Sequence, residues 1–207
     1  MGRKIPEATI RRLTHYLRCI EFIKEDGDKI VQSRDLATFC DISDSLVRRD
    51  LSYFGEFGTK GVGYPISKLE DHIKKILGLD KIKKTVLAGV GNMGRAILNF
   101  PFIKNGFQIV AAFDVKKALI GNKINNVPVF HIEDIKEIIK RHSVEIGIIA
   151  VPQKEAEEVA NKMIDGGIRG ILSFALLKCP LKKKVPIRYI EIAAELEILS
   201  YEIEKEG

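Results

Sequence analysis

The sequence predicts an α/β protein with an N-terminal winged helix-turn-helix domain, a Rossmann-type, doubly wound and mostly parallel sheet domain, and a C-terminal helix. Three observations support this prediction. A glycine-rich segment at residues 89–94 lies between a strand-like run and a helix-like run. Strand-like and helix-like runs then alternate, as they do in doubly wound sheets. Before residue 79, amphipathic helical patterns lead into a second glycine-rich segment at residues 55–63. We expect domains at residues 1–78 and 79–190, followed by a C-terminal helix at 191–207.

The N-terminal part contains three predicted helices. Pro6-Glu7 marks the start of the first, which runs over residues 8–24 with apolar residues at helical spacing. Ser33 is expected to cap a short helix over residues 34–40. Ser43 is expected to cap a further helix over residues 44–54.

This third helix has two distinct faces. Apolar residues lie on one face, at positions i, i+4 and i+7: Val47, Leu51 and Phe54. Polar residues lie on the other: Ser45, Arg48, Arg49 and Ser52. Two helices joined by a short turn, with arginines facing outward on the second, are typical of a helix-turn-helix. Such arginines can donate hydrogen bonds to guanine or to phosphates, so the pattern predicts a DNA-binding surface.

The glycine-rich segment after this helix predicts a tight β-hairpin, the wing of a winged helix. Lys60 is expected near its tip, where it would contact the DNA backbone or the minor groove. The alternative is a solvated helix face followed by an ordinary loop. The alternative is the weaker one, because a two-faced helix and a glycine-rich segment follow each other in the order that a winged helix requires.

A dinucleotide-binding fingerprint follows a predicted strand at residues 84–88 and opens a predicted helix at residues 92–100. Its residues are Gly89, Val90, Gly91, Asn92, Met93 and Gly94. In this context the glycines allow a tight turn and a close approach of the backbone to pyrophosphate, and the helix N-terminus offers N–H groups to an anion. The alternative is a structural glycine turn without a ligand.

Asp114 ends the next predicted strand, residues 107–113, and lies where an acid accepts hydrogen bonds from the adenosine ribose. A carboxylate there would repel a 2′-phosphate, so we expect NAD and NADH rather than the phosphorylated coenzymes. Lys116 and Lys117 leave the alternative open, because nearby cations could accommodate a phosphate.

The remaining pattern completes the sheet. Helices are expected at residues 132–141 and 153–166, and strands at 145–151, 168–173 and 189–192. Ligands of open α/β sheets bind beyond the carboxyl ends of the strands. The residues there are therefore expected to border a cofactor crevice, although they could also be ordinary turns: Val151, Pro152, Ser173, Phe174 and Ala175.

The C-terminal segment, residues 193–205, is predicted to be an amphipathic helix. It has an apolar stripe made of Ile192, Leu196, Leu199 and Ile203. The stripe could pack on the protein's own sheet or on a second subunit.

Composition excludes several classes. No apolar run is long enough to span a bilayer, and no secretory signal follows Met1, so we expect a cytoplasmic protein. The net charge of +6 permits a nucleic-acid partner. Cys19, Cys40 and Cys179 share no metal-ligand spacing, and no metal is expected. Cys19 and Cys40 are expected to be buried small hydrophobes, with a thiol-based sensor as the weaker alternative.

Three motifs together resemble the Rex family of redox-sensing transcriptional repressors. They are residues 47–55, residues 61–64 and the fingerprint at 89–94, and the resemblance extends to residues 6–9 and 191–196. It implies a homodimer that binds a palindromic operator and is released by NADH, in competition with NAD. It also implies that the C-terminal helix is swapped onto the partner subunit. Together with the helix face, it predicts DNA contacts from Ser45, Arg48, Arg49, Ser52, Tyr53 and Lys60.

The resemblance also implies residues that couple the two sites. Arg18 matches an arginine of the family that communicates between the domains. Glu191 lies where some members have an aspartate, and keeps its charge. Phe100 lies where some members have a tyrosine that bonds this aspartate. Phenylalanine has no hydroxyl, so only packing of its ring near the nicotinamide is expected.

The competing functional class is an NAD-dependent oxidoreductase with an accessory N-terminal domain. Such an enzyme needs a substrate pocket and a proton donor beside the nicotinamide. The residues after Asp114 are taken up by the predicted sheet, which leaves no substrate domain. Tyr201 and Lys205 have the spacing of a short-chain dehydrogenase pair, but they lie on a terminal helix. We therefore expect no enzymatic activity.

Overall fold

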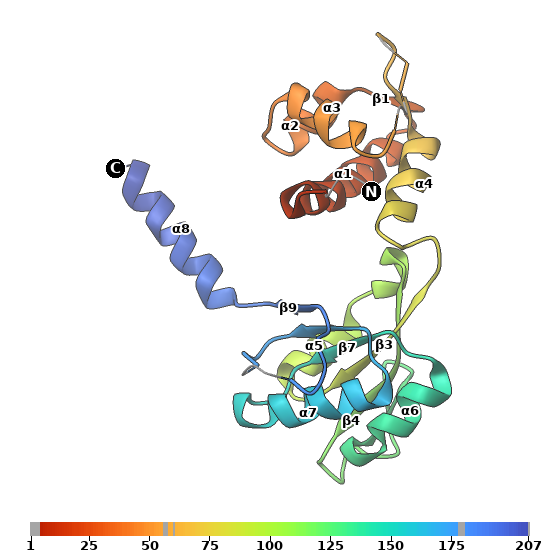
Figure 1. The fold of residues 1–207 in the computed structure, drawn as a ribbon, viewed down its shortest axis with the longest axis vertical. Helices are drawn as coiled ribbons and strands as arrows, with labels where there is room; N and C mark the ends of the chain where they lie inside the picture. Colours follow the sequence, from red (N-terminus) through yellow and green to blue (C-terminus); the bar gives the residue numbers. More distant parts are fainter. Residues whose placement is uncertain (1–4, 56–57, 60, 178–180, 207) are drawn as a thin grey trace. The chain divides into compact units, whose positions relative to one another are not determined.

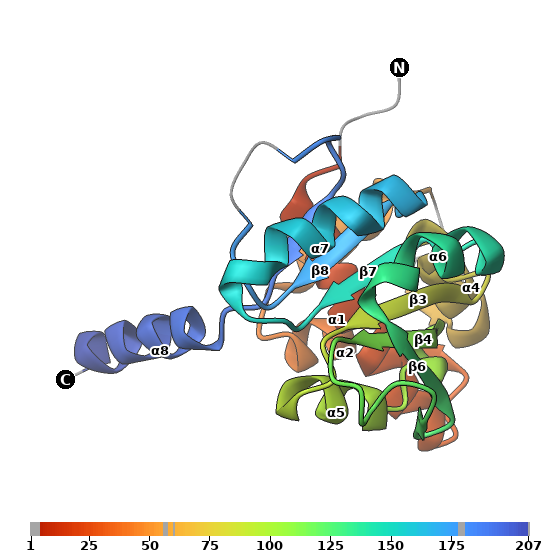
Figure 2. The same cartoon turned by 90° about the horizontal axis from the view of Figure 1, so that it is seen from below.

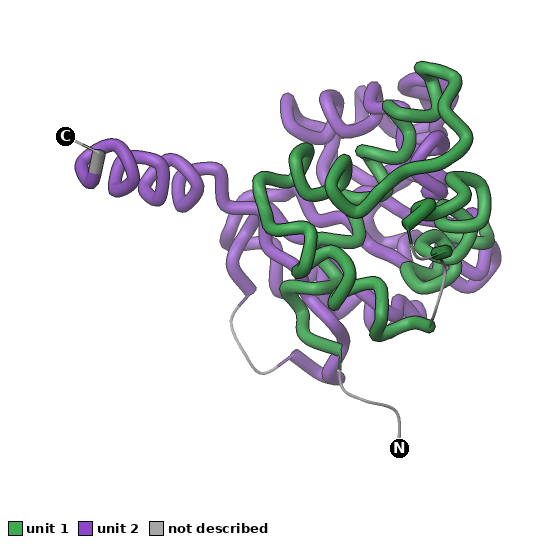
Figure 3. The backbone as a smooth tube through the Cα atoms, turned by 90° about the horizontal axis from the view of Figure 1, so that it is seen from above, with its two compact units in different colours: residues 1–81 green, residues 82–207 purple. Residues whose placement is uncertain are grey.

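The structure is a computed structural model of the 207-residue chain, and it describes residues 5–55, 58–59, 61–177 and 181–206. The chain folds as two compact units, residues 1–81 and residues 82–207 (Figure 3). Each unit has a hydrophobic core of its own. None of the helices in the described residues combines the length and the apolar content that crossing a bilayer requires.

The first unit is built from helices α1 to α4 and a small antiparallel sheet (Figure 1). Its elements are α1 (Glu7–Glu25), β1 (Ile30–Val31), α2 (Ser33–Phe39), α3 (Asp44–Ser52), β2 (Tyr64–Pro65) and α4 (Ile66–Ile76). The three predicted helices are confirmed as α1, α2 and α3. The β1–β2 sheet and α4 were not predicted.

The N-termini of α2 and α3 can be compared with the two predicted N-cap residues, Ser33 and Ser43. Ser43 caps α3 as predicted, since its Oγ accepts a hydrogen bond from the N–H of Leu46 at 3.3 Å. The prediction for Ser33 is wrong, because Gln32 is the N-cap of α2 and Ser33 is its first helical residue. The carboxylate of Asp35 explains the difference: it accepts a hydrogen bond from the N–H of Gln32 at 2.8 Å.

The second unit is an α/β sheet with strand order β5-β6-β4-β3-β7-β8-β9. The pairs from β6 to β9 are parallel, and β5 pairs antiparallel with β6. The strands are β3 (Lys83–Ala88), β4 (Phe107–Asp114), β5 (Lys123–Ile124), β6 (Val127–His131), β7 (Ile146–Ile149), β8 (Gly170–Ser173) and β9 (Ile187–Tyr189). The order reverses between β3 and β7, which is where open α/β sheets place a ligand.

Helices cover both faces of this sheet, as the predicted doubly wound fold requires (Figure 2). One core packs the sheet against α6 (Ile135–His142) and α7 (Gln153–Gly166). The other core packs the opposite face against α5 (Asn92–Asn99), with the short helix η1 (Phe102–Asn105) beside it. The helix predicted at 132–141 is divided into the short helix η2 (Ile132–Asp134) and α6.

Two parts of the second unit differ from the predictions. The strand predicted at residues 189–192 is wrong, since β9 ends at Tyr189 and Ile192 starts a helix. Tyr189 pairs with Ser173, the last residue of β8, so no partner strand continues beyond it. The β5–β6 hairpin was not predicted; its two-residue turn has Asn125 and Asn126 at φ 47° and 65°, a conformation that asparagine tolerates.

Helix α8 (Ile192–Glu206) confirms the predicted C-terminal helix. Its apolar stripe is at least 50% exposed at every position: Ile192, Leu196, Leu199 and Ile203. The alternative in which the stripe packs on the protein's own sheet is therefore not found in this chain.

Candidate functional site

The glycine loop after β3 has a shape that only glycine permits at two positions. Gly89 has φ +93°, and a Cβ there would lie 2.4 Å from the carbonyl oxygen of Ala150 at the end of the neighbouring strand β7. A Cβ on Gly94 would lie 2.0 Å from the carbonyl oxygen of Gly89. The start of α5 therefore packs directly against the end of β3, and neither glycine can be replaced without moving the loop.

Asp114 fixes this loop from the end of β4. One carboxylate oxygen, Oδ2, accepts a hydrogen bond from the N–H of Val90 at 2.8 Å, and Oδ1 accepts one from the N–H of Lys116 at 2.9 Å. The side chain is half-buried and borders a cavity. Each carboxylate oxygen has a second lone pair, so Asp114 can still accept hydrogen bonds from a ligand.

The cavity beside the loop has a volume of about 690 Å³, within the range of small-molecule sites. It lies at the carboxyl ends of the strands and at the N-terminus of α5, whose first N–H groups have no partner within the helix. Predicted cofactor residues line it: Gly89, Gly91, Asn92, Met93, Asp114, Val151, Pro152 and Phe174. The structure thus brings together segments far apart in the sequence.

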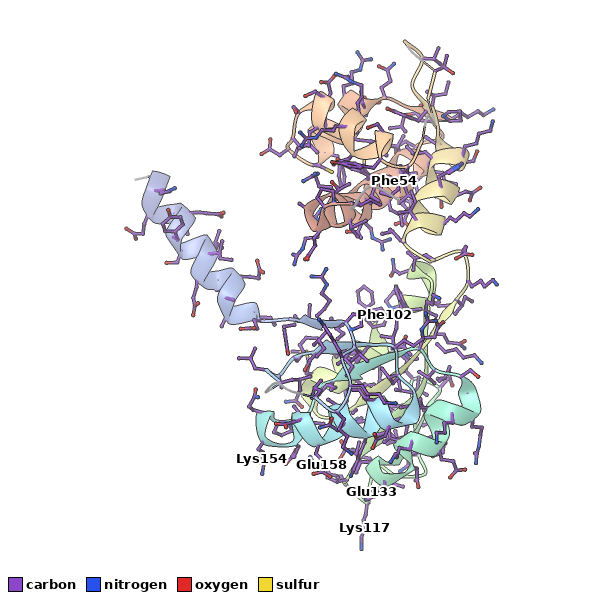
Figure 4. The ribbon with its side chains drawn as sticks, viewed as in Figure 1. Phe54, Phe102, Lys117, Glu133, Lys154 and Glu158 are labelled. Carbon is purple, nitrogen blue, oxygen red and sulfur yellow. The ribbon has the colours of Figure 1, made fainter. Side chains whose placement is uncertain are left out.

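Three other predicted cofactor residues do not line this cavity. Val90 is buried and contributes its N–H to Asp114, while Gly94 lies beneath the loop. Phe100 follows the last residue of α5 and is 54% exposed. Its ring centroid lies 4.6 Å from that of Phe102, which is labelled in Figure 4. A contact between Phe100 and the nicotinamide stays a prediction.

A charged rim that the sequence analysis missed also lines the cavity. Lys162 Nζ lies 2.6 Å from Glu133 Oε1 and 2.8 Å from Glu158 Oε1; both glutamates are labelled in Figure 4. Lys162 donates hydrogen bonds to these two carboxylates, and this raises its pKa. Lys116 lines the cavity as well, whereas Lys117 is exposed and points into solvent (Figure 4). The i,i+4 spacing of Glu158 and Lys162 on a predicted helix was the sequence signal that could have predicted this ion pair.

The loop after β8 is held against the start of α7. The hydroxyl of Ser173 donates a hydrogen bond to the carbonyl of Ala175 at 2.6 Å. The side-chain amide of Gln153 bonds both the N–H and the carbonyl of Leu176. This positions Phe174 at the cavity. Gln153 was missed because it was considered only as the first residue of a helix.

In the first unit, α3 presents the predicted faces. Val47 and Leu51 are buried, and Phe54 is half-buried against the same core. The polar residues Ser45, Arg48, Arg49 and Ser52 are exposed, and Tyr53 is half-buried. The two-faced helix is therefore confirmed, while its contacts with DNA stay a prediction.

Arg48 is held by neighbouring polar side chains on this surface. Its guanidinium lies 2.5 Å from Asp44 on the same helix and donates a hydrogen bond to the Oγ of Ser33 at 3.2 Å. This contact with Arg48 lowers the pKa of Asp44. Arg48 is thereby held across the N-terminal parts of α2 and α3.

A hairpin follows α3 as predicted. The N–H of Thr59 donates to the carbonyl of Gly63 at 3.0 Å, and the N–H of Gly63 donates back at 3.1 Å. A Cβ on Gly63 would lie 2.7 Å from the carbonyl oxygen of Val31, so glycine is needed beside β1. A groove of about 710 Å³ lies between α2, α3 and this hairpin. Lys60, the predicted tip residue, lies outside the described residues.

The two predicted coupling residues lie in different units. Arg18 on α1 is half-buried, and its Nη1 lies 2.5 Å from Glu21 Oε2. Glu191 is exposed and directly precedes α8. Their role stays a prediction.

The cysteines have no feature of a reactive thiol in the described part of the chain. Cys19 is buried and Cys40 is half-buried. Burial raises the pKa of Cys19 to about 11 and also raises the pKa of Cys40, opposite to the change that activates a thiol. Cys179 lies outside the described residues. Among those described, no group of histidine, cysteine and acidic side chains could hold a metal ion.

Two known families each match one part of the chain. The family described as "CoA binding domain" matches residues 80–177. The family described as "Putative DNA-binding protein N-terminus" matches residues 4–52.

Relatives match over nearly the whole chain. A redox-sensing transcriptional repressor Rex from Carboxydothermus hydrogenoformans is 42% identical over 206 residues, which is 99% of this chain and 99% of the relative. Rex 1 of Thermotoga maritima is 42% identical over 205 residues, 98% of each chain. Rex of Listeria monocytogenes is 38% identical over 202 residues, 97% of this chain and 94% of the relative.

Solved structures of a Rex-family repressor are also similar to this chain over nearly its whole length. A crystal structure of RSP in complex with β-NAD+ and operator DNA has a TM-score of 0.89 and 35% identity, covering 99% of this chain and 94% of that one. A structure of RSP with β-NADH has a TM-score of 0.86 and 32% identity, covering 99% and 96%. RSP is described as a Rex-family repressor.

Proposed function

The chain belongs to the Rex family of redox-sensing transcriptional repressors, and we propose that it represses transcription as a homodimer on palindromic operator DNA until NADH releases it. It is a regulator rather than an enzyme, so the oxidoreductase alternative is set aside. The observation that carries the proposal is the likeness to Rex repressors over 99% of the chain, which includes both candidate sites.

In this proposal α3 is the recognition helix. Its exposed arginines, Arg48 and Arg49, enter the major groove and donate hydrogen bonds to guanine edges or phosphates. Ser45, Ser52 and Tyr53 contact the adjacent backbone. The hairpin after α3 adds Lys60 to the phosphate backbone or the minor groove.

NADH and NAD occupy the cavity of the second unit. Asp114 accepts hydrogen bonds from the adenosine ribose, and the N-terminus of α5 faces the pyrophosphate. The carboxyl ends of β7 and β8 place Val151, Pro152 and Phe174 toward the nicotinamide end. A 2′-phosphate would meet the Asp114 carboxylate, which favours the unphosphorylated coenzymes.

The two sites communicate through the dimer. The exposed apolar stripe of α8 supports a contact with the partner subunit, because a stripe of this kind is usually covered in an assembled protein. Arg18, Glu191 and Phe100 are the proposed coupling residues. Half-sites on DNA need a fixed angle between the two recognition helices, so a modest rotation is enough to lose binding. We place this activity in the cytoplasm, where a bacterial repressor meets DNA.

The direct test is an operator titration. The protein first selects a palindromic duplex from a random pool, and the affinity for that duplex is then measured with NADH, NAD or NADPH present. We expect saturating NADH to weaken operator binding at least about tenfold, a coupling free energy of about 1.4 kcal/mol. NAD should leave the protein bound. Equal operator affinity with and without NADH would contradict the proposal.

A further inference from the structure

A fully buried carboxylate lies on the inner face of the recognition helix. Asp50 of α3 is 0% exposed, although it directly follows the two exposed arginines. Its carboxylate accepts hydrogen bonds from Thr9 Oγ1 at 3.0 Å and from the Tyr16 hydroxyl at 2.8 Å. Arg12 donates to both of its oxygens, from Nε at 2.5 Å and from Nη2 at 2.8 Å. All of these donors belong to α1.

The donors lie on one face of α1, at positions i, i+3 and i+7. Burial would raise the pKa of Asp50, but the hydrogen bonds from Arg12, Tyr16 and Thr9 outweigh it and hold this pKa below its usual range. Asp50 is therefore ionised in the interior, with its charge balanced by Arg12. Breaking such a buried pair is costly, so the two helices stay joined through it.

This network is a directional link between α1 and α3. The backbone of α3 packs closely on α2, whereas the backbones of α1 and α3 approach each other closely at few points. Apolar contacts from Val47 and Leu51 bury α3 in the same core, but they are non-directional and tolerate small rotations. Hydrogen bonds weaken steeply with angle, so Asp50 restricts both the rotation and the axial shift of α3.

We propose that Asp50 is a positioning residue that sets the orientation of α3 and thereby its discrimination between operator and other DNA. The inference rests on the proposed function, in which α3 reads base edges. Asp50 itself touches no DNA, because its carboxylate is covered by α1. Phosphate contacts tolerate a displaced helix, whereas bidentate contacts with base edges require close alignment. Loss of Asp50 should therefore reduce specificity more than general DNA affinity.

The test compares two buried carboxylates of the same unit. Asp50→Asn removes the charge that joins α1 to α3. Glu70→Gln is the matched control: Glu70 of α4 is 7% exposed and joins α4 to α1 through Lys24 at 2.8 Å, while Lys74 of its own helix lies 2.5 Å from it. Both variants remove one buried carboxylate, and only the first lies on the recognition helix.

The measurement is the ratio of affinity for the selected operator to affinity for a scrambled duplex, with active protein counted by stoichiometric titration. We expect Asp50→Asn to lower this ratio at least tenfold, with NADH affinity and scrambled-duplex affinity nearly unchanged. Glu70→Gln should leave the ratio within twofold of the wild type. A merely destabilised protein would lose both affinities together, so the ratio separates positioning from folding.

A milder variant covers the case in which Asp50→Asn does not fold. Tyr16→Phe removes one hydrogen bond to Asp50 and keeps the Arg12 pair, so a fall of a few-fold in the ratio is expected. An unchanged ratio in every folded variant of this network overturns the inference, as does an equal fall in Glu70→Gln. Wild-type protein that selects no operator overturns the proposed function instead.

Discussion

Two aspartates hold the two proposed binding elements of this molecule, and they do so in different ways. Asp50 holds the recognition helix from behind, fully buried, and accepts hydrogen bonds from side chains of α1. Asp114 holds the glycine loop from one side, half-buried, and accepts hydrogen bonds from backbone N–H groups of Val90 and Lys116.

The difference separates positioning from binding. A carboxylate enclosed by side chains has no open lone pair for a ligand, so its effect on the ligand is indirect. A carboxylate that accepts hydrogen bonds from backbone N–H groups at the edge of a cavity keeps lone pairs available. It can therefore orient the loop and bind the ligand at the same time. Changes near Asp50 should therefore alter the quality of DNA recognition, whereas changes near Asp114 should alter coenzyme affinity.

The largest effect is expected from Gly94→Ala. The added Cβ would lie 2.0 Å from the Gly89 carbonyl oxygen, so the loop must move. We expect NADH affinity measured by calorimetry to fall at least about 100-fold, about 2.7 kcal/mol. The matched variant is Gly91→Ala, because a Cβ at Gly91 meets no atom within 4 Å. It should keep the wild-type unfolding temperature and weaken NADH only through its methyl group in the cavity. Wild-type NADH affinity in Gly94→Ala would show that the loop does not contact the ligand.

The next effect tests the outer face of the recognition helix. Arg49→Ala should weaken operator binding by about 1–3 kcal/mol, because an arginine that reads a base edge contributes about this much. Arg141→Ala in the second unit, an exposed arginine, gives the same change of net charge. Its operator affinity should be close to that of the wild type in the same gel-shift assay. Equal losses in the two variants would mean that only net charge matters.

A smaller effect is expected at the cavity. Asp114→Asn should weaken NADH about tenfold, about 1.4 kcal/mol, since the ribose loses a charged acceptor. The same variant should bind NADPH relatively better, because the repulsion of the 2′-phosphate is removed. Glu137→Gln, an exposed acid on α6, is the control. Calorimetry with both coenzymes tests this, and an unchanged preference between them would remove Asp114 from the specificity of the site.

The smallest expected effect is that of pH on the stability of the fold near neutral pH. The pKa of Asp50 lies below its unfolded value of about 3.8, so its contribution to stability is present above that pH and is lost as the pH falls through the lower folded pKa. Glu70, whose pKa is also lowered, adds to the same trend. Chemical unfolding should therefore show little change between about pH 6 and 8 and a loss of stability in acid. Asp50→Asn should lose part of this acid dependence, and a variant with the full wild-type dependence would contradict the assignment.

Much of the fold followed from local patterns. The N-cap of α3 at Ser43 and the buried Val47 and Leu51 follow from capping chemistry and helical spacing, both of which act within a few residues. The glycine loop was recognisable because its neighbours on both sides carried the pattern of strand and helix. The β5–β6 hairpin was missed, since its Asn-Asn turn was not weighed as a turn with positive φ.

Features that depend on distant partners were harder to predict. Asp50 follows two arginines and was not distinguished from a surface charge, although its spacing from Val47 and Leu51 places it on the buried face. Gln153 bonds a loop more than twenty residues away. In both cases the side chain's role is set by tertiary contacts, which local patterns do not encode.

The Asp50 network has a consequence for the history of the family. A carboxylate enclosed by Thr9, Arg12 and Tyr16 leaves these four positions unable to change one at a time without exposing an unpaired buried group. We therefore expect them to covary among relatives: a homologue that replaces the acid with an apolar residue should also have lost the arginine. In such relatives, apolar packing without this hydrogen-bond network would hold the recognition helix in place.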